Sequence, residues 1–207
     1  MKAKKCKVCK KEFSPFRPLQ QVCSLKCASE HARQQEAKRW KKKKAQMKEE
    51  GKTLTDWKAD LQKEVNQIIH LIDKNQPCVS CGGSSKMNAG HFHAVGSNDS
   101  LRFHFENIWL QDVHCNMHKG GNNHAFDNGL IELFGKEYWE ELKFDLVKRF
   151  PLVKFTVADL HFAISEARKI KKELKQADQI YPTKMRVALR RRYNERLKLY
   201  KKTNIKP

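Results

Sequence analysis

The 207-residue chain is poor in acidic residues and has no long apolar run. It contains 23 Asp and Glu residues against 43 Lys and Arg residues, which gives a formal net charge of +20. A chain so basic is expected to bind polyanions, and nucleic acid is the first candidate. No apolar run approaches the roughly 18 residues that a membrane-spanning helix requires, so we expect no membrane partner.

We expect neither a signal peptide nor an RNA-stacking motif. The lysine-rich start, Met1 to Lys5, leads into cysteines instead of an apolar stretch, so we expect a soluble cytoplasmic protein. Reductants keep thiols free there, and six of the seven cysteines lie in short-spaced pairs, which favours metal ligation over disulfides. An RNA-associated zinc protein is an alternative interpretation, but only the positive charge favours it, because the chain has no motif of aromatic residues that would stack on bases.

The length predicts one or two domains with a modest core. We expect an α+β fold of small zinc-stabilised modules. The predicted segments are a four-cysteine zinc knuckle at 1–30, a basic and amphipathic helical linker at 31–75, a metal-binding module at 76–150 and basic helices at 151–207.

The first thirty residues carry two cysteine clips, Cys6-x2-Cys9 and Cys23-x3-Cys27, separated by 13 residues. These spacings let both pairs reach one zinc ion. A segment too small to build a core would gain folding energy from that metal. The alternative is a disordered tail of free thiols, in which the apolar residues of the segment would have nothing to pack against.

Helical patterns surround the centre of the chain. Residues 28–52 are polar, and we expect Lys41, Lys42, Lys43 and Lys44 either to follow DNA phosphates or to belong to a solvated spacer that ends near Gly51. Residues 53–72 have apolar side chains at spacings of three and four, which predicts an amphipathic helix that covers the next module.

Further helices are predicted after residue 122. One should close at Gly135, the next at Phe150, and a capping box at Thr156 should open another. A last helix is expected after Pro182. Residues 168–202 contain 14 basic and 3 acidic residues, and we expect DNA contacts from Arg190, Arg191 and Arg192.

Residues 78–122 hold three cysteines and five of the nine histidines. Thiolates can pin loops through zinc, a histidine can activate water, and an asparagine or histidine can hold a catalytic cation. The order Gly90-His91, Asn107, Cys115-Asn116 is typical of a ββα-metal (His-Asn-His) module, in which a hairpin presents a histidine to the first turns of a helix. Gly90 permits a tight approach, 101–105 alternates as a strand can, and a helix should begin between residues 112 and 115.

Cys78, Cys81 and Cys115 would let a second zinc ion tie the hairpin to the helix. Asp112, three residues before Cys115, is the first candidate for the fourth ligand, and His114 and His118 are rivals. In the alternative interpretation, Asp112 only caps the start of the helix, and a histidine completes the zinc site or the zinc is absent.

The chain resembles the lambdoid-phage NinG (Rap) recombination proteins, a family of ββα-metal endonucleases that process branched DNA. The resemblance spans most of the chain, and one departure is that the family pattern has cysteine where this chain has Asp112. The residues that carry it are Pro77–Gly82, Ala89–Phe92, Leu101–Phe103, Glu106–Ile108, Cys115–Lys119 and Gly121–Asn122, together with Cys6, Cys9, Cys23 and Cys27.

The resemblance implies roles for individual residues. His91 becomes the first histidine, Asn107 the loop-locking asparagine, and Asn116 the helix residue nearest a catalytic Mg²⁺ or Mn²⁺ ion, to which its amide carbonyl offers an oxygen. Since Gly90 precedes His91 where many relatives have an acid or histidine, His91 is either the general base or a cation ligand with His93 as base.

Other polar residues of the module are assigned with alternatives. His118 is a candidate ligand of the zinc or the catalytic cation, a phosphate donor, or a surface residue. Arg102, Lys119 and Asn122 are expected to contact DNA, although a solvated loop at 119–122 is the alternative. We expect His104 and His124 to be structural.

The implied activity is hydrolysis of a phosphodiester in Holliday junctions or D-loops by histidine-activated water, with two structural zinc ions and one catalytic Mg²⁺ or Mn²⁺ ion. The implied partners are branched or duplex DNA, phage or host recombination proteins, and a second copy of the chain, whose symmetry would match a two-fold junction. The alternative is a non-catalytic zinc protein that binds or anneals DNA during recombination.

Overall fold

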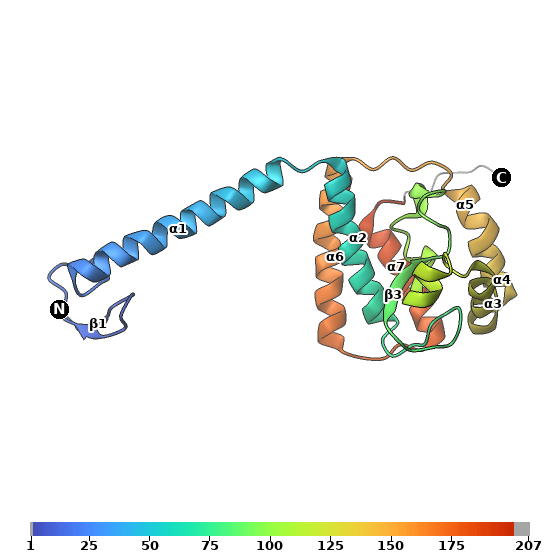
Figure 1. Ribbon diagram of the computed structural model, residues 1–207, viewed down its shortest axis with the longest axis horizontal. Helices are drawn as coiled ribbons and strands as arrows, with labels where there is room; N and C mark the ends of the chain where they lie inside the picture. Colours follow the sequence, from blue (N-terminus) through green and yellow to red (C-terminus); the bar gives the residue numbers. More distant parts are fainter. Residues whose placement is uncertain (1, 201–207) are drawn as a thin grey trace. The chain divides into compact units, whose positions relative to one another are not determined.

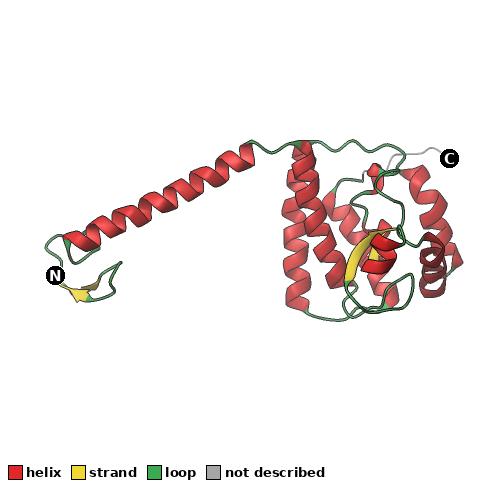
Figure 2. Cartoon of the chain, in the orientation of Figure 1, coloured by secondary structure: helices red, strands yellow, loops and turns green. Residues whose placement is uncertain are grey.

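The computed structural model describes residues 2–200, which divide into two compact units at the boundary between Lys52 and Thr53. Helices dominate, and each unit has one two-stranded antiparallel sheet (Figure 2). The expected combination of helices and small sheets is therefore present. The end of the predicted C-terminal segment, 201–207, lies outside the described residues. Within 2–200, no helix has the length and apolar character that a bilayer crossing requires.

The first unit is a small sheet followed by one long helix. Strands β1 (Lys4–Lys5) and β2 (Glu12–Phe13) pair, and α1 (Leu25–Glu50) follows. The side chain of Ser24 caps α1 by accepting from the backbone N–H of Cys27, and Gly51 ends the helix, as predicted. None of the residues of α1 is buried, so α1 is solvated along its length in this unit.

The second unit begins with α2 (Leu54–Ile72), whose Thr53 cap forms a capping box with Asp56, and α6 begins in the same way at Thr156. After α2 come β3 (Met87–His91), short 3₁₀ turns at Asp99–Leu101 and Phe105–Asn107, and β4 (Ile108–Asp112). A π-helical turn at His114–His118, α3 (Asn123–Phe134), α4 (Lys136–Glu140), a second π-helical turn at Glu141–Asp145 and α5 (Leu146–Arg149) follow. The unit ends with α6 (Val157–Ala177) and α7 (Thr183–Leu197).

The β3–β4 hairpin lies between two apolar cores. Ile108 and Leu110 pack with α2, α6 and α7, while Trp109 points to the opposite core, which contains residues of α3 and α5. Helices α2 and α6 lie side by side on the first of these faces (Figure 1). All residues of β4 are buried, because both faces of the strand are covered.

The expected strand at 101–105 is wrong. This stretch runs from the last residue of one 3₁₀ turn to the first residue of the next, and the strand that pairs with β3 is Ile108–Asp112, with His91 opposite Ile108. The apolar side chains still find buried places, because Phe103 and Phe105 enter the core beside α2 while Leu101 enters the other core. The alternating apolar side chains of this segment therefore pack into two separate cores and do not form one face of a sheet.

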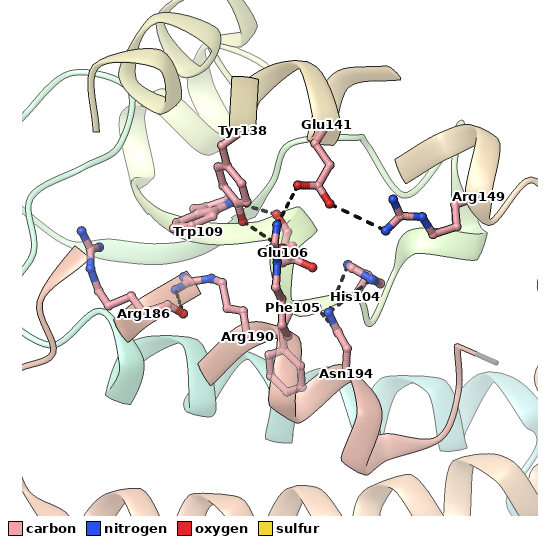
Figure 3. Close-up of polar contacts among 11 residues, drawn as sticks. His104, Phe105, Glu106, Trp109, Tyr138, Glu141, Arg149, Arg186, Arg190 and Asn194 are labelled. Atoms are coloured by element: carbon pink, nitrogen blue, oxygen red, sulfur yellow. Dashed lines mark hydrogen bonds and ion pairs between the residues drawn. The ribbon is translucent and has the colours of Figure 1, made fainter. Parts of the chain in front are cut away.

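The prediction that Arg190 contacts DNA is also wrong, because its side chain is 0% exposed. Its Nη2 donates to the Oδ2 atom of buried Asp73 at 2.6 Å, and Nη1 of Arg186 lies 3.3 Å from Asp73 Oδ1. The guanidinium of Arg190 lies over the ring of Trp109, 3.7 Å from its centroid (Figure 3). Two basic side chains of α7 thus belong to the core that joins α2, β4 and α7.

We predict that Asp73→Asn lowers the free energy of unfolding by about 3 to 5 kcal/mol, because it leaves two buried guanidinium groups without a counter-charge. Urea denaturation of the two proteins measures this difference. Asp178→Asn is the matched control, since Asp178 pairs with Lys74 at an exposed site and its loss should cost under about 1 kcal/mol. Equal effects of the two substitutions would contradict the structural role of Asp73.

Candidate active site and metal centres

Four thiols converge in the first unit. The Sγ atoms of Cys6, Cys9, Cys23 and Cys27 all lie within 4.8 Å of one another. The Cys9–Cys23 and Cys23–Cys27 sulfur distances are 3.5 and 3.7 Å. A tetrahedral zinc site with Zn–S bonds of about 2.3 Å has sulfur–sulfur edges of roughly 3.8 Å. The donor set and its spacing therefore fit the predicted zinc knuckle.

The pKa values of Cys6 and Cys23 are shifted in opposite directions. Burial raises the pKa of Cys6, but hydrogen bonds from the backbone of Cys9, Val8 and Cys23 outweigh it and lower the pKa to about 6. Hydrogen bonds with Cys9 and then Cys27, together with burial, raise the pKa of Cys23 to about 12. Thiols placed so closely cannot all ionise unless a cation compensates their charge, and a divalent metal ion supplies that charge.

A second thiol cluster joins the hairpin region to the helical turn that follows β4. The Sγ atoms of Cys78, Cys81 and Cys115 also lie within 4.8 Å of one another, and Cys78 and Cys115 are buried. Three thiolates are an acceptable zinc donor set whose fourth position is open. A metal ion held here would connect the loop before β3 to the turn that carries Asn116.

The carboxylate of Asp112 lies outside this group of converging ligands, as do His114 and His118. Asp112 Oδ1 accepts from the backbone N–H of His114 at 2.7 Å, and the hydroxyl of Ser85 donates to Oδ2. These two hydrogen bonds, Ser85 first, lower the pKa of Asp112. The arrangement matches the capping interpretation of Asp112 and leaves the second cluster with three converging thiols as candidate metal ligands.

Helix α3 packs against the cysteine loop at a glycine. A Cβ atom added to Gly129 would lie 1.7 Å from the carbonyl oxygen of Val79, so only glycine allows this approach. The close approach predicted for Gly90 is also present, since a Cβ atom there would lie 2.3 Å from Gln111 Oε1. Gly129 thus lets α3 contact the backbone of the cysteine loop, and Gly90 leaves room for the side chain of Gln111 on the neighbouring strand.

Three of the predicted site residues line one cleft of about 460 Å³. His91 ends β3, His93 lies in the loop that follows, and Asn116 lies on the π-helical turn His114–His118. All three are partly exposed. The cleft therefore brings two imidazole rings and one amide together from segments about 25 residues apart in the sequence.

Both imidazoles are oriented by backbone carbonyls. His91 Nε2 lies 2.9 Å from the carbonyl oxygen of Arg102, and His93 Nε2 lies 2.8 Å from that of Leu142. A carbonyl only accepts, so each Nε2 carries the proton and each neutral ring keeps a bare Nδ1. Burial is the main cause that lowers the pKa of both histidines, which favours this neutral form.

Asn107 is fully buried, directly precedes β4, and is hydrogen-bonded to the loop that follows β3. Its Oδ1 accepts from the backbone N–H of His93 at 2.7 Å, and its Nδ2 donates to the carbonyls of His93 at 3.1 Å and Leu101 at 3.2 Å. The backbone carbonyl of Asn107 also accepts from Phe92. These hydrogen bonds hold the His93 segment beside the end of the hairpin.

The remaining predicted residues of the module, Arg102, His118, Lys119 and Asn122, are not among the described residues that line this cleft. Arg102 contributes the carbonyl that binds His91, and its guanidinium lies 3.5 Å from Asp99. Asn122 precedes α3 in a left-handed conformation, with its Nδ2 3.4 Å from the sulfur of Cys115. His118 and Lys119 are exposed.

Predicted DNA-binding residues elsewhere differ in their surroundings. Lys41, Lys42, Lys43 and Lys44 are all exposed on α1. Arg192 is exposed, whereas Arg191 is half-exposed and pairs with Glu106 at 2.9 Å and Glu141 at 2.7 Å. The hydroxyl of Tyr138 also donates to Glu106 (Figure 3). The charge of Arg191 is therefore already balanced by carboxylates.

The two histidines expected to be structural, His104 and His124, differ in burial. His104 is 4% exposed and contacts Tyr200, with ring centroids 4.7 Å apart, and burial lowers its pKa to about 3. His124 is exposed and lies beside Asn128. Neither is among the described residues that line the cleft.

Two charged residues of the cleft, Asp127 on α3 and Lys143 on the second π-helical turn, were not predicted. Their side chains form an ion pair of 2.8 Å. No motif marks them, because isolated Asp and Lys residues are common in helices. Their meeting depends on how α3 packs against the Glu141–Asp145 turn, which local sequence patterns do not reveal.

We predict two zinc ions per chain in purified protein, and one after Cys78→Ser. Asp112→Ala should keep both ions and lower the free energy of unfolding by about 1 kcal/mol, because Asp112 caps a turn. Metal analysis by mass spectrometry and chemical denaturation measure the two effects. If Asp112→Ala instead loses one ion per chain, Asp112 is a zinc ligand and the capping interpretation fails.

Comparisons with known proteins agree with the resemblance carried by the motifs. The family model described as "Bacteriophage Lambda NinG protein" matches residues 1–178. Protein ninG of Escherichia phage 933W is 31% identical over 160 residues, which cover 68% of this chain and 80% of that protein. Protein ninG of Escherichia phage lambda is 37% identical over 89 residues, 42% of this chain and 44% of that protein, and no solved structure matches. Since the family model covers most of its length, the chain belongs to the NinG family of bacteriophage proteins.

Proposed function

We propose that this protein is a divalent-cation-dependent endonuclease that cuts branched recombination DNA, such as Holliday junctions or D-loops. The observation that carries the proposal is the cleft that His91, His93 and Asn116 line together, in which each histidine has its Nε2 bound to a carbonyl and its Nδ1 unprotonated. A base and an oxygen ligand for a hard cation are the two groups that hydrolysis of a phosphodiester requires.

The order of the surrounding elements supports a ββα-metal module within the predicted segment 76–150. Strands β3 and β4 form an antiparallel hairpin, and helical structure begins two residues after β4. His91 ends the first strand and Asn116 lies in the helical turn, as in a module that presents a histidine toward a helix. Asn107 joins the two by locking the intervening loop.

The reaction would begin with removal of a proton from water by a histidine Nδ1. The resulting hydroxide attacks the phosphorus in line, and the bond to the 3′ oxygen breaks. The Nε2–H bond to a backbone carbonyl keeps the imidazole ring in place and stabilises the positive charge that it gains. A Mg²⁺ or Mn²⁺ ion near the amide oxygen of Asn116 would stabilise the charge on the phosphate and on the leaving oxygen.

Two assignments of the histidines fit this scheme. In the first, His91 is the general base. In the second, the Nδ1 atom of His91 binds the cation with Asn116, and His93 is the base. Both rings have the same tautomer and a lowered pKa.

We predict that alanine at the general-base histidine lowers the cleavage rate of a branched DNA by at least about 10²-fold without weakening DNA binding. His91→Ala and His93→Ala should be compared in single-turnover cleavage at several Mg²⁺ concentrations. Loss of rate at saturating Mg²⁺ identifies the base, whereas a raised Mg²⁺ requirement identifies a cation ligand. His124→Ala, at an exposed position that is not among the described residues lining the cleft, is the control and should cut normally.

The alternative function is a non-catalytic zinc protein that binds or anneals DNA during recombination. It predicts that DNA binding is the same with and without Mg²⁺ or Mn²⁺ and that no strand is cut. Absence of cation-dependent cleavage in the wild-type protein would therefore overturn the nuclease proposal. Competition among junction DNA, duplex DNA and RNA in one titration would separate an RNA-binding role from both.

The proposed partners follow from charge and family. Exposed lysines of α1, Arg192 and the 119–122 loop would contact phosphates, so affinity should fall with salt at a slope near −0.9 per phosphate contacted. A homodimer would match the two-fold symmetry of a junction. We place the activity in the cytoplasm of the infected host, where phage or host recombination proteins would supply the branched substrate.

A further inference from the structure

One turn of the chain supplies two different groups to the cleft. The carbonyl of Leu142 accepts the Nε2–H of His93, and the next residue, Lys143, presents its side chain to the cleft lining. Both residues lie in the π-helical turn Glu141–Asp145. Such turns are rare and frequently occur at functional sites. The position of the turn therefore determines the orientation of a histidine and the location of a positive charge together.

The ammonium group of Lys143 is held from several sides. Its Nζ lies 2.9 and 2.8 Å from Oδ1 and Oδ2 of Asp127, which also accepts from Trp139 Nε1 at 2.7 Å. The same Nζ lies 5.5 Å from the ring centroid of Phe92 and 5.7 Å from that of Trp139. A surface lysine normally loses little by moving, but this one has a carboxylate and two aromatic rings as neighbours.

The charge balance of the cleft gives Lys143 a distinct position. Among the described residues that line it, Lys143 is the one Lys or Arg and Asp127 is the one carboxylate. An ammonium has three N–H donors, and the two oxygens of Asp127 use at most two of them. One donor thus remains for an anion, and the side chain of Lys143 is 36% exposed.

We propose that Lys143 binds the phosphate group that is cut, and that Asp127 is a positioning residue that holds the ammonium toward it. The inference rests on the proposed nuclease function and adds a phosphate-binding residue to it. Charge on the phosphate oxygens increases in the transition state, so a fixed ammonium stabilises that state more than the bound substrate. Lys143 contributes positive charge on the protein side, beside the histidine that takes the proton.

Asp127 has a rival role as a second ligand of the catalytic cation. The geometry favours the positioning role, because both carboxylate oxygens lie within 2.9 Å of Lys143 Nζ and Oδ1 also accepts from Trp139. The two roles differ in an observable way. A ligand determines how much Mg²⁺ is needed, whereas a positioning residue changes the rate at saturating Mg²⁺.

The test compares Lys143→Met, Lys143→Arg and Asp127→Asn in the full-length protein. Cleavage is measured under single-turnover conditions over a range of Mg²⁺, and binding of the same branched DNA is measured without divalent cation. We expect Lys143→Met to lower the maximal rate by roughly 10²- to 10³-fold with an unchanged Mg²⁺ midpoint. Lys143→Arg should recover part of that rate because it restores the charge.

Asp127→Asn gives the sharper readout, because the cleavage rate should fall without a loss of DNA affinity. The rate should fall when the ammonium loses its anchor, while DNA binding should stay equal or tighten because a carboxylate near the phosphate is removed. A purely structural role of the pair would lower rate, affinity and thermal stability together. That joint loss, or a raised Mg²⁺ midpoint for Asp127→Asn, overturns the proposal.

Lys148→Met is the matched control, since Lys148 is 76% exposed on α5, pairs with Asp145 at the end of the preceding turn, and is not among the described residues that line the cleft. It should cut and bind DNA as the wild type does. If Lys143→Met also behaves as wild type, Lys143 contacts no phosphate. If the wild-type protein cuts no DNA, the nuclease proposal fails by itself, and the binding measurements still decide Lys143: weaker binding than Lys148→Met supports the phosphate contact, and equal binding overturns it.

Discussion

The buried amide of Asn107 is the constraint on which the candidate site depends most. It bonds to the N–H and the carbonyl of His93 and to the carbonyl of Leu101, so its donor and acceptor groups are both used. Aspartate would lack the N–H donors, and a buried acceptor left without its donor costs about 1 to 3 kcal/mol. An amide of this length is therefore the side chain that can close the loop after β3 and hold His93 beside the end of the hairpin.

Once that loop is closed, backbone carbonyls determine the chemistry of the two imidazoles. The carbonyl oxygen of Arg102 binds the imidazole of His91, and that of Leu142 binds the imidazole of His93. These contacts do not depend on the side chains of Arg102 and Leu142. The carbonyls come from a 3₁₀ turn region and from a π-helical turn, where carbonyls are not all used by regular helical hydrogen bonds. Irregular backbone around the hairpin thus provides the acceptors that fix each ring with its Nδ1 free.

Sequence patterns identified the parts of this arrangement whose chemistry is local. The cysteine spacings predicted both thiol clusters, and the capping box at Thr156 predicted the start of α6. The pairing of Asp127 with Lys143 spans 16 residues and arises from the packing of separate helical segments, so no spacing rule could predict it. The strand expected at 101–105 failed for a related reason, because its alternation serves two cores whose existence depends on the whole fold.

The same argument changes how the net charge of +20 is interpreted. A guanidinium is planar and more weakly hydrated than an ammonium, so it can be buried against an aromatic ring beside a carboxylate, as Arg190 is between Trp109 and Asp73. Lysine is more strongly hydrated, and the run Lys41 to Lys44 is exposed throughout. Part of the arginine charge of α7 therefore stabilises the fold, and the electrostatic attraction of DNA falls more to exposed lysines than a count along the sequence implies.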